Sequence, residues 1–172
     1  MSIKSVPFIG SLLIITLISS CYSEQYNEEK INNICSGIDT LLYNVKSEQF
    51  DWGSGEAYSN FMGFFYNSEL VFINERLNFR DGGDSINWYY IHKNSMIKFV
   101  ERSNNYKNGN DKDSKRKTLY DLMLLISPSG QVINYKKTIN GKNESLSSEE
   151  SDKIYNHSLE LINIIKERSK IL

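Results

Sequence analysis

Apolar residues recur with helical spacing near the two ends of the chain. In the first pattern they lie mostly three or four positions apart, at Ile31, Ile34, Ile38, Leu41, Leu42 and Val45. This spacing places them on one face of a helix. Near the other end, Ser147 and Glu150 fit a capping box at the start of a helix. The apolar face of that second helix is expected to consist of Ile154, Leu161, Ile162 and Ile165.

Between these two helices, apolar and polar residues alternate in short runs separated by turn residues such as Asn67-Ser68. Alternation of this kind predicts antiparallel strands with one buried face and one solvated face. We expect strands at 58–66, 70–79, 86–91, 96–102, 118–126 and 131–139. Segment 49–55 is interpreted as a loop because of Gly53 and Gly55. The sequence therefore predicts an α+β fold: an N-terminal helix, an antiparallel meander of about six strands, and a C-terminal helix packed on one sheet face.

A sheet with one apolar face requires both helices to pack on that face, which would leave the opposite face open to a partner. Trp88 and Tyr90 share strand parity with Ile86, so we expect them in the core. The other parity contains Asn87, Tyr89 and Ile91, which are therefore candidate partner-binding residues. An exposed tyrosine beside asparagine suits recognition of a protein or a glycan. Alternatively, the tyrosine rings lie over the sheet edge with only their hydroxyls in water.

Segment 103–117 is long, polar and almost without apolar residues. Such a composition buries too little surface to order itself, so we interpret it as a mobile loop. Residues 30–172 are otherwise expected to form a single α+β domain, as their length suggests. The whole chain has 20 basic and 21 acidic residues. This balance provides no basic surface for phosphates, so no nucleic-acid partner is expected.

The N-terminal residues have the anatomy of an export signal. Lys4 precedes an apolar run over 6–18, and small residues follow it directly before Cys21. That run is shorter than the roughly 20 residues of a membrane-spanning helix, and it has the length of a signal-peptide core. The sequence therefore predicts a signal peptide over 1–20. The alternatives are an ordinary secretory signal with a chance cysteine beside the cleavage site, or an N-terminal core helix.

The segment Ile18-Ser19-Ser20-Cys21 resembles the lipobox of bacterial lipoproteins, with isoleucine where leucine is commoner. This resemblance implies that Cys21 begins the mature chain and carries diacylglycerol on its thiol and a further acyl chain on its amine. Residues 21–29 would then be a lipidated tether to the bacterial cell envelope. Tyr22 stands where an aspartate would retain such a protein at the inner membrane, so the resemblance implies the outer membrane in a double-membraned host.

A second likeness concerns the folded domain. Segment 87–99 is similar to strand-turn-strand segments in uncharacterised secreted bacterial lipoproteins with a tyrosine-rich β-meander. Asn94-Ser95 stands where those proteins have Asn-Gly at the turn. The likeness supports a fold type and supplies no site.

Catalytic and metal-binding patterns are sparse in this sequence. His92 and His157 lie in different expected elements without neighbouring ligands at metal-site spacing, so no metal or cofactor is expected. Cys35 is either a small buried hydrophobe or a reactive or intermolecular thiol. A thiol–imidazole pair of Cys35 with a histidine has no local support. No nucleophile elbow, Walker or Rossmann pattern occurs, so no catalytic residue is assigned.

These observations favour a membrane-anchored envelope lipoprotein that acts as a non-enzymatic binding or scaffold module for an envelope or extracellular partner. Immunity-type proteins that block a toxin belong to this class. The alternative is a cell-wall or glycan-directed hydrolase whose site is assembled only in the fold. Carboxylates converging in one deep pocket, or Cys35 meeting a histidine, would favour the hydrolase. A shallow sheet face with exposed rings would favour binding.

Overall fold

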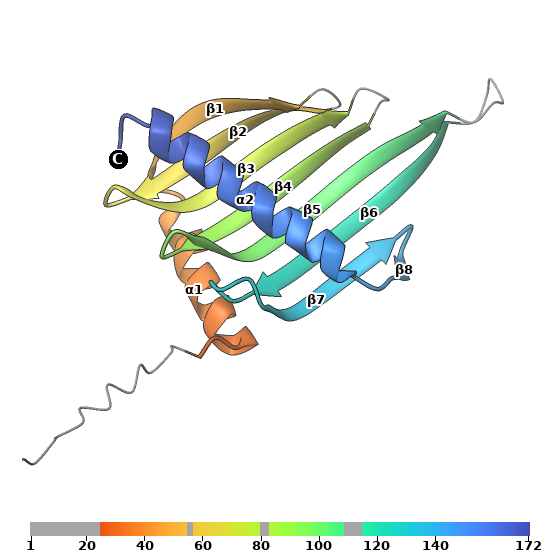
Figure 1. The fold of residues 1–172 in the computed structure, drawn as a ribbon, viewed down its shortest axis with the longest axis horizontal. Coiled ribbons are helices and arrows are strands. Elements are labelled where there is room, and N and C mark those ends of the chain that lie inside the picture. The colour runs from red at the N-terminus through yellow and green to blue at the C-terminus, as the bar shows by residue number, and fades with distance from the viewer. Residues whose placement is uncertain (1–24, 55–56, 80–82, 109–114) are drawn as a thin grey trace, which may run out of the picture.

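The computed structural model describes residues 25–54, 57–79, 83–108 and 115–172 (Figure 1). The signal peptide over 1–20 and residues 21–24 of the tether, Cys21 included, lie outside these residues. The elements, in chain order, are α1 (Glu28–Leu41), β1 (Lys46–Ser54), β2 (Ala57–Tyr66), β3 (Glu69–Phe79), β4 (Gly83–His92), β5 (Ser95–Asn108), β6 (Lys115–Ile126), β7 (Val132–Ile139), β8 (Lys142–Asn143) and α2 (Ser148–Arg168). The α+β class is confirmed, but the described sheet has eight strands instead of about six.

The strands form one antiparallel sheet whose spatial order follows the chain, from β1 to β8. Each strand pairs with the next one along the chain, as expected for a meander. The longest pairing joins β5 to β6, from Lys98 opposite Leu125 to Asn108 opposite Lys115. It runs through much of the segment that we expected to be a mobile loop.

That loop expectation is wrong for residues 103–108 and 115–117, which continue β5 and begin β6. The hydrogen-bond ladder between two strands satisfies backbone groups whatever the side chains are, so a polar composition does not prevent pairing. Segment 49–55 is likewise not a loop up to Ser54, because β1 covers it. Phe50 and Trp52 alternate there with polar residues, and Gly53 lies near the end of the strand.

The two helices pack on opposite faces of the sheet, so the expectation of one shared face is wrong. Helix α2 crosses in front of the strands in Figure 1 and buries Leu161, Ile162 and Ile165 in the larger core cluster. Helix α1 buries Ile31 and Cys35 in a second cluster with residues of β5 and β6. The sheet is thus covered on both sides, but to different extents.

A continuous apolar run in β6 explains this second cluster. Leu124 and Ile126 face α2, whereas Leu125 between them faces α1. Strands buried on both faces read as continuous apolar runs instead of alternating ones. Polar contacts complete the attachment of α1. The Tyr90 hydroxyl donates to Asp39 at 2.9 Å, and the Asn134 side chain donates to Glu28 at 2.9 Å.

The helix boundaries follow from local capping. The Asn27 side chain accepts from the backbone N–H of Lys30 at 2.9 Å and caps α1. The expected cap of α2 is confirmed, because the Ser147 hydroxyl accepts from the N–H of Glu150 at 3.2 Å. The Glu150 carboxylate in turn accepts from the Ser147 backbone N–H, as a capping box requires. It also accepts from Tyr120 on β6 and Lys137 on β7, each at 2.7 Å.

Candidate functional site

The candidate partner-binding residues lie in the interior. The exposed fractions of Tyr89, Asn87 and Ile91 are 1%, 4% and 1%, so their expected exposure is wrong. All three face α2. Trp88 and Tyr90, which we expected in the core, lie on the opposite face and are partly exposed. The sequence correctly divided these residues between two faces of β4, but it assigned the wrong face to the core. The set that contains Asn87 and Tyr89 faces the larger core, although it is the more polar of the two.

Beneath α2, polar residues of three strands meet one histidine of the helix. Glu75 of β3 is fully buried and accepts from the Tyr89 hydroxyl at 2.6 Å and from the Asn87 amide at 3.1 Å. His157 Nε2 lies 3.0 Å from Glu75 Oε1. The Ser85 hydroxyl lies 2.7 Å from the Asn87 side-chain oxygen and 3.2 Å from Glu101 on β5. We call this group the Glu75 cluster: Glu75, Ser85, Asn87, Tyr89, Glu101 and His157.

Opposing effects set the charges of the central pair. Burial alone would raise the pKa of Glu75, but the hydrogen bond and charge of His157, with the bonds from Tyr89 and Asn87, hold that pKa below its usual value. Burial alone would lower the pKa of His157, but Glu75, and to a lesser extent Glu160, raise it above its usual value. An opposite charge at this distance favours both ionised forms, so the two residues form a buried ion pair at neutral pH.

Glu101 behaves differently although it belongs to the same cluster. Its burial, together with the nearby charges of Glu150 and Glu75, raises the pKa of Glu101 to about 7. Hydrogen bonds from Ser85 and Ser103 offset only part of this effect. The cluster therefore contains one carboxylate that is ionised at neutral pH and one that changes charge near it.

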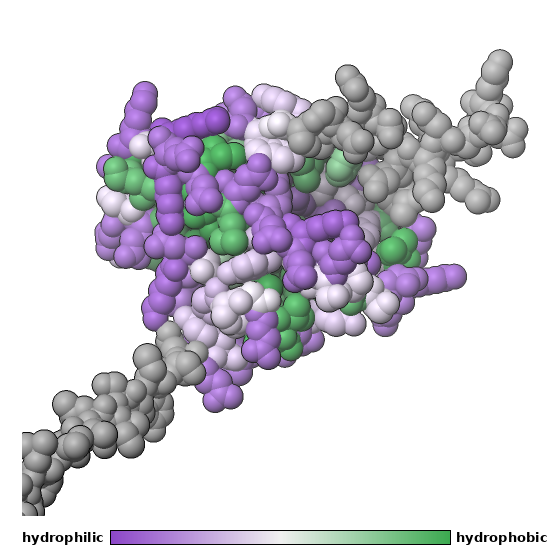
Figure 2. Space-filling model, in the orientation of Figure 1, coloured by the Kyte–Doolittle hydropathy of each residue, from purple (hydrophilic) through white to green (hydrophobic). Residues whose placement is uncertain are grey.

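Contacts around the cluster close it from the side of α2. The Trp52 indole N–H donates to Glu160 at 2.7 Å, and its ring meets the His157 ring edge-on with centroids 4.9 Å apart. The His157 side chain retains 22% exposure, whereas Glu75 has none. Figure 2 shows this side of the molecule as mostly hydrophilic, with hydrophobic atoms in separate groups. Acid–base chemistry at Glu75 would thus require a substrate to displace part of α2.

The opposite face is open beyond the part that α1 covers. Strand register aligns two rows of side chains there, and none of them is buried. The first row is Met62, Asn74, Trp88, Val100, Met123 and Lys136. The second row is Asn60, Arg76, Ile86, Arg102, Asp121 and Thr138. We call these two rows the open face.

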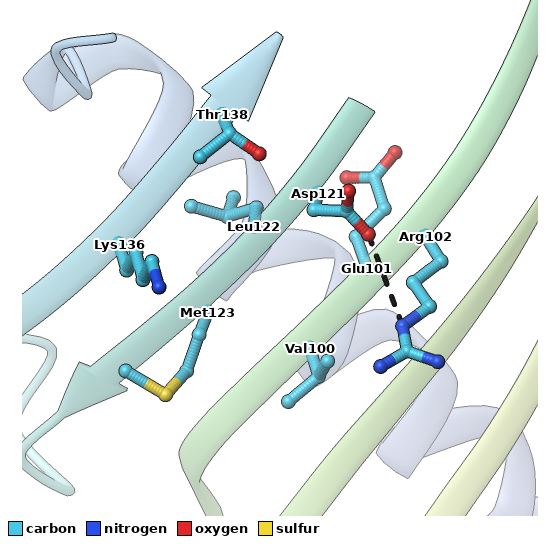
Figure 3. A pocket seen from close by; sticks show the side chains of 8 residues that line it. All are labelled: Val100, Glu101, Arg102, Asp121, Leu122, Met123, Lys136 and Thr138. Carbon is cyan, nitrogen blue, oxygen red and sulfur yellow. Dashed lines mark ion pairs between the residues drawn. The ribbon is translucent and has the colours of Figure 1, made fainter. Parts of the chain in front are cut away.

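A depression of about 380 Å³ lies on the open face across β5, β6 and β7 (Figure 3). Val100 and Met123 are paired neighbours in its apolar part. The Arg102 Nε lies 3.8 Å from Asp121 Oδ1, and the Arg102 guanidinium lies 5.7 Å from the centroid of the Trp88 ring. Lys136 and Thr138 line the side formed by β7. Sequence reasoning missed this site, because Val100, Arg102 and Met123 stand out only once neighbouring strands align them.

The burial of Cys35 argues against nucleophilic chemistry at its thiol. It is free and 2% exposed, and burial raises the pKa of its thiol to about 12. A thiol with so high a pKa remains protonated and unreactive at neutral pH. His157 lies on the other side of the sheet. The buried-hydrophobe interpretation of Cys35 is therefore supported.

Among the described residues, no group of three or more histidines, cysteines and carboxylates is arranged to hold a metal ion. In the same part of the chain, no helix is both long and apolar enough to cross a membrane. Comparisons with protein-family models, with curated proteins and with solved structures find no match to this chain.

Proposed function

We propose that this protein is a membrane-anchored envelope lipoprotein whose domain is a non-enzymatic binding or scaffold module for an envelope or extracellular partner. The open face carries this proposal. One side of the sheet is closed by α2 over a large core, whereas the other presents a mostly apolar row beside a mostly polar one. Immunity-type proteins that block a toxin fall within the same class.

The composition of the open face supports binding. Tryptophan, methionine and arginine are enriched at protein interfaces, and tryptophan and arginine often dominate their energetics. Trp88 and Met123 lie in the first row and Arg102 in the second. The sheet also holds these side chains on regular strands, so the surface is formed before a partner arrives. Preorganisation of this kind reduces the entropy lost on binding.

The anchor follows from the lipobox resemblance of residues 18–21. Several acyl chains on Cys21 would hold the protein stably, since one chain alone gives only reversible binding. Helix α1 begins at Glu28 with Asn27 as its cap, so residues 21–26 are what remains of the tether. When extended they would span about 20 Å, which keeps the domain close to the membrane. A cell-envelope location, at the outer membrane in a double-membraned host, follows from the same resemblance. A fatty-acid probe should label the wild-type protein but not Cys21→Ala, and label on the variant would overturn the anchor.

Photo-crosslinking in cells tests the binding module. A photoreactive amino acid at Met62 or Met123 should give a discrete adduct, because both side chains lie on the open face. The matched controls are Asn163 and Glu167, which are exposed on the outer side of α2. Adducts from the two open-face positions alone would support the proposal. Equal adducts from α2, or none from the open face, would overturn it.

The alternative, a cell-wall or glycan-directed hydrolase, gains support from the convergence of Glu75, Glu101 and His157. Two carboxylates in different electrostatic environments are typical of acid–base pairs. Digestion of purified peptidoglycan by the wild type and by Glu75→Gln and Glu101→Gln distinguishes the two functions. Release of fragments that is lost in both variants, with their folds intact, would establish the hydrolase.

A further inference from the structure

We propose that the depression across β5, β6 and β7 is the anchoring pocket of the open face, and that it takes a protein segment carrying an apolar side chain next to a carboxylate. This inference rests on the proposed binding function and names the chemistry of the partner. Three properties carry it: the apolar floor of the depression, an unbalanced positive charge at its rim, and, next to it on β4, a tryptophan ring already covered on one side.

The floor of the depression suits an apolar side chain. Val100 and Met123 pair directly across β5 and β6, and both are partly exposed. Glu101 and Leu122 also line it, but they belong by strand parity to the other face, where Leu122 is buried and the Glu101 carboxylate meets Ser85. The volume of about 380 Å³ is near the lower end for ligand pockets, which run from about 300 to 1,000 Å³. It therefore suits one or two side chains.

The charges around the floor do not cancel. Arg102 and Asp121 form an ion pair at 3.8 Å. Lys136 lies opposite Met123 and is exposed, and its side chain forms no ion pair or hydrogen bond with any part of the chain that the structure describes. Two cations thus face one carboxylate, and a carboxylate on the partner would complete the balance. Complementary charges at an exposed rim contribute more to selectivity and association rate than to affinity.

Other ligand chemistries fit the depression less well. A polyanion needs several cations, but Arg102 is paired with Asp121 and Arg76 lies 4.0 Å from Asp84. A sugar stacks on an open aromatic face, but the Arg102 guanidinium lies 5.7 Å from the Trp88 ring centroid. Methionine and valine side chains beside an arginine-covered tryptophan instead resemble the apolar centre and polar rim of a protein interface.

Methyl NMR on the full lipidated chain in detergent tests this inference, with methionine methyls labelled by ¹³C. Met123 reports on the depression, Met62 on the far part of the open face, and Met96 on the buried core facing α2. The probes are three peptides with blocked ends: Glu-Leu-Phe-Glu, Lys-Leu-Phe-Lys and Glu-Ser-Ser-Glu. A neutral chitooligosaccharide is the fourth probe.

We expect Glu-Leu-Phe-Glu to shift the Met123 signal in a saturable way and to leave Met96 unchanged. Glu-Ser-Ser-Glu lacks the apolar anchor and should leave Met123 unshifted. Lys136→Glu should weaken the binding of Glu-Leu-Phe-Glu by about fivefold, as expected for one exposed charge. The same variant should strengthen the binding of Lys-Leu-Phe-Lys. The affinities of Lys136→Gln for these peptides should lie between those of the wild type and Lys136→Glu. An unshifted Met96 signal in each variant reports an intact core.

Equal binding of the acidic and basic peptides at Met123, or no effect of Lys136→Glu, would overturn the partner chemistry and leave the binding face in place. A shift of Met123 by the chitooligosaccharide alone would overturn it in favour of a glycan. Absence of any Met123 shift would also overturn it. The proposed binding function is tested independently by the crosslinking experiment in cells, so a failure of that function can be told apart from a failure of the partner chemistry.

Discussion

The two faces of the sheet differ in what covers them and in how their polar groups are satisfied. On the α2 side, charged and polar residues such as Glu75 are buried, and each member of the Glu75 cluster bonds to a neighbour within the protein. On the other side, α1 covers the part around Tyr90, Ile97 and Leu125, and the two rows of the open face keep their polar groups in water. The closed face buries a polar cluster within its apolar core, whereas the open face has apolar residues outside.

This difference assigns separate roles to the two faces. Buried polar groups are costly unless they are paired, so the Glu75 cluster commits α2 to one position on the sheet. Partly exposed methionine, valine and tryptophan on the open face lose water when a partner covers them, which is favourable. Stability is thus concentrated on one face and binding capacity on the other. The experiments below challenge that division, in order of expected effect.

Leu161→Asp should cause the largest change. Leu161 is fully buried between α2 and the sheet, so the substitution places an unpaired charge in the larger core. We expect a loss of unfolding free energy of about 4–5 kcal/mol or complete unfolding. Thermal denaturation followed by circular dichroism measures it. The exposed neighbour change Asn163→Asp is the control, and similar melting of the two variants would contradict this packing of α2.

His157→Ala should be the next most damaging change, because it leaves Glu75 buried without its partner. Removing one member of a buried ion pair costs about 3–5 kcal/mol. The pKa of Glu75 is lowered in the fold, so the pair's contribution is lost as pH falls below 4.5. The pKa of His157 is raised, so that contribution is also lost as pH rises above 6.5 and through the folded value.

Wild-type stability from this pair should therefore be greatest in the window between those limits. Chemical denaturation at a series of pH values tests the point with wild type, His157→Ala, Glu75→Gln and the double variant. A coupling energy near zero in that cycle, or the same pH profile in the wild type and His157→Ala, would show that the pair does not hold α2.

Glu101→Gln should stabilise the protein at neutral and alkaline pH. Burial raises the pKa of Glu101 to about 7, so ionising it costs more in the fold than in the unfolded chain, where the usual value is 4.5. The unfolding free energy of the variant should increasingly exceed that of the wild type as pH rises from 4.5 through 7. Above that range the difference should stay constant. We expect about 1–2 kcal/mol, discounted for partial exposure. Chemical denaturation of the wild type and of Glu101→Gln at pH 4 and at pH 8 measures this difference. A difference between the two proteins that is no larger at pH 8 than at pH 4 would contradict the burial of this charge.

Arg102→Ala should have the smallest effect on stability. Arg102 is exposed and its ion pair with Asp121 is a surface pair, so the change in unfolding free energy should stay within about 0.5 kcal/mol. The same variant should reduce crosslinking from Met123, since it removes part of the open face. Destabilisation comparable to that of His157→Ala would show that the open face contributes to the fold instead of binding.

The elements that sequence reasoning recovered are those with a local signal. The spacing of apolar residues located both helices, and Ser147 marked the start of α2 through a cap that the structure confirms. Turn residues such as Asn67 and Asn94, which have positive φ angles, separated strands that pair as hairpins. Strand β1 was missed because glycines near its end outweighed the alternation of Phe50 and Trp52.

The sequence by itself determined the α+β class, the two amphipathic helices and the meander of neighbouring strands, because each depends on contacts between residues close in the chain. Only the tertiary structure decided which face of the sheet lies inside. Alternation shows that Trp88 and Tyr89 point in opposite directions, but it does not show which direction is buried. Glu75 and His157 are far apart in the sequence, and a carboxylate is buried only where such a distant partner compensates its charge. The same holds for the open face, whose rows exist only through strand register.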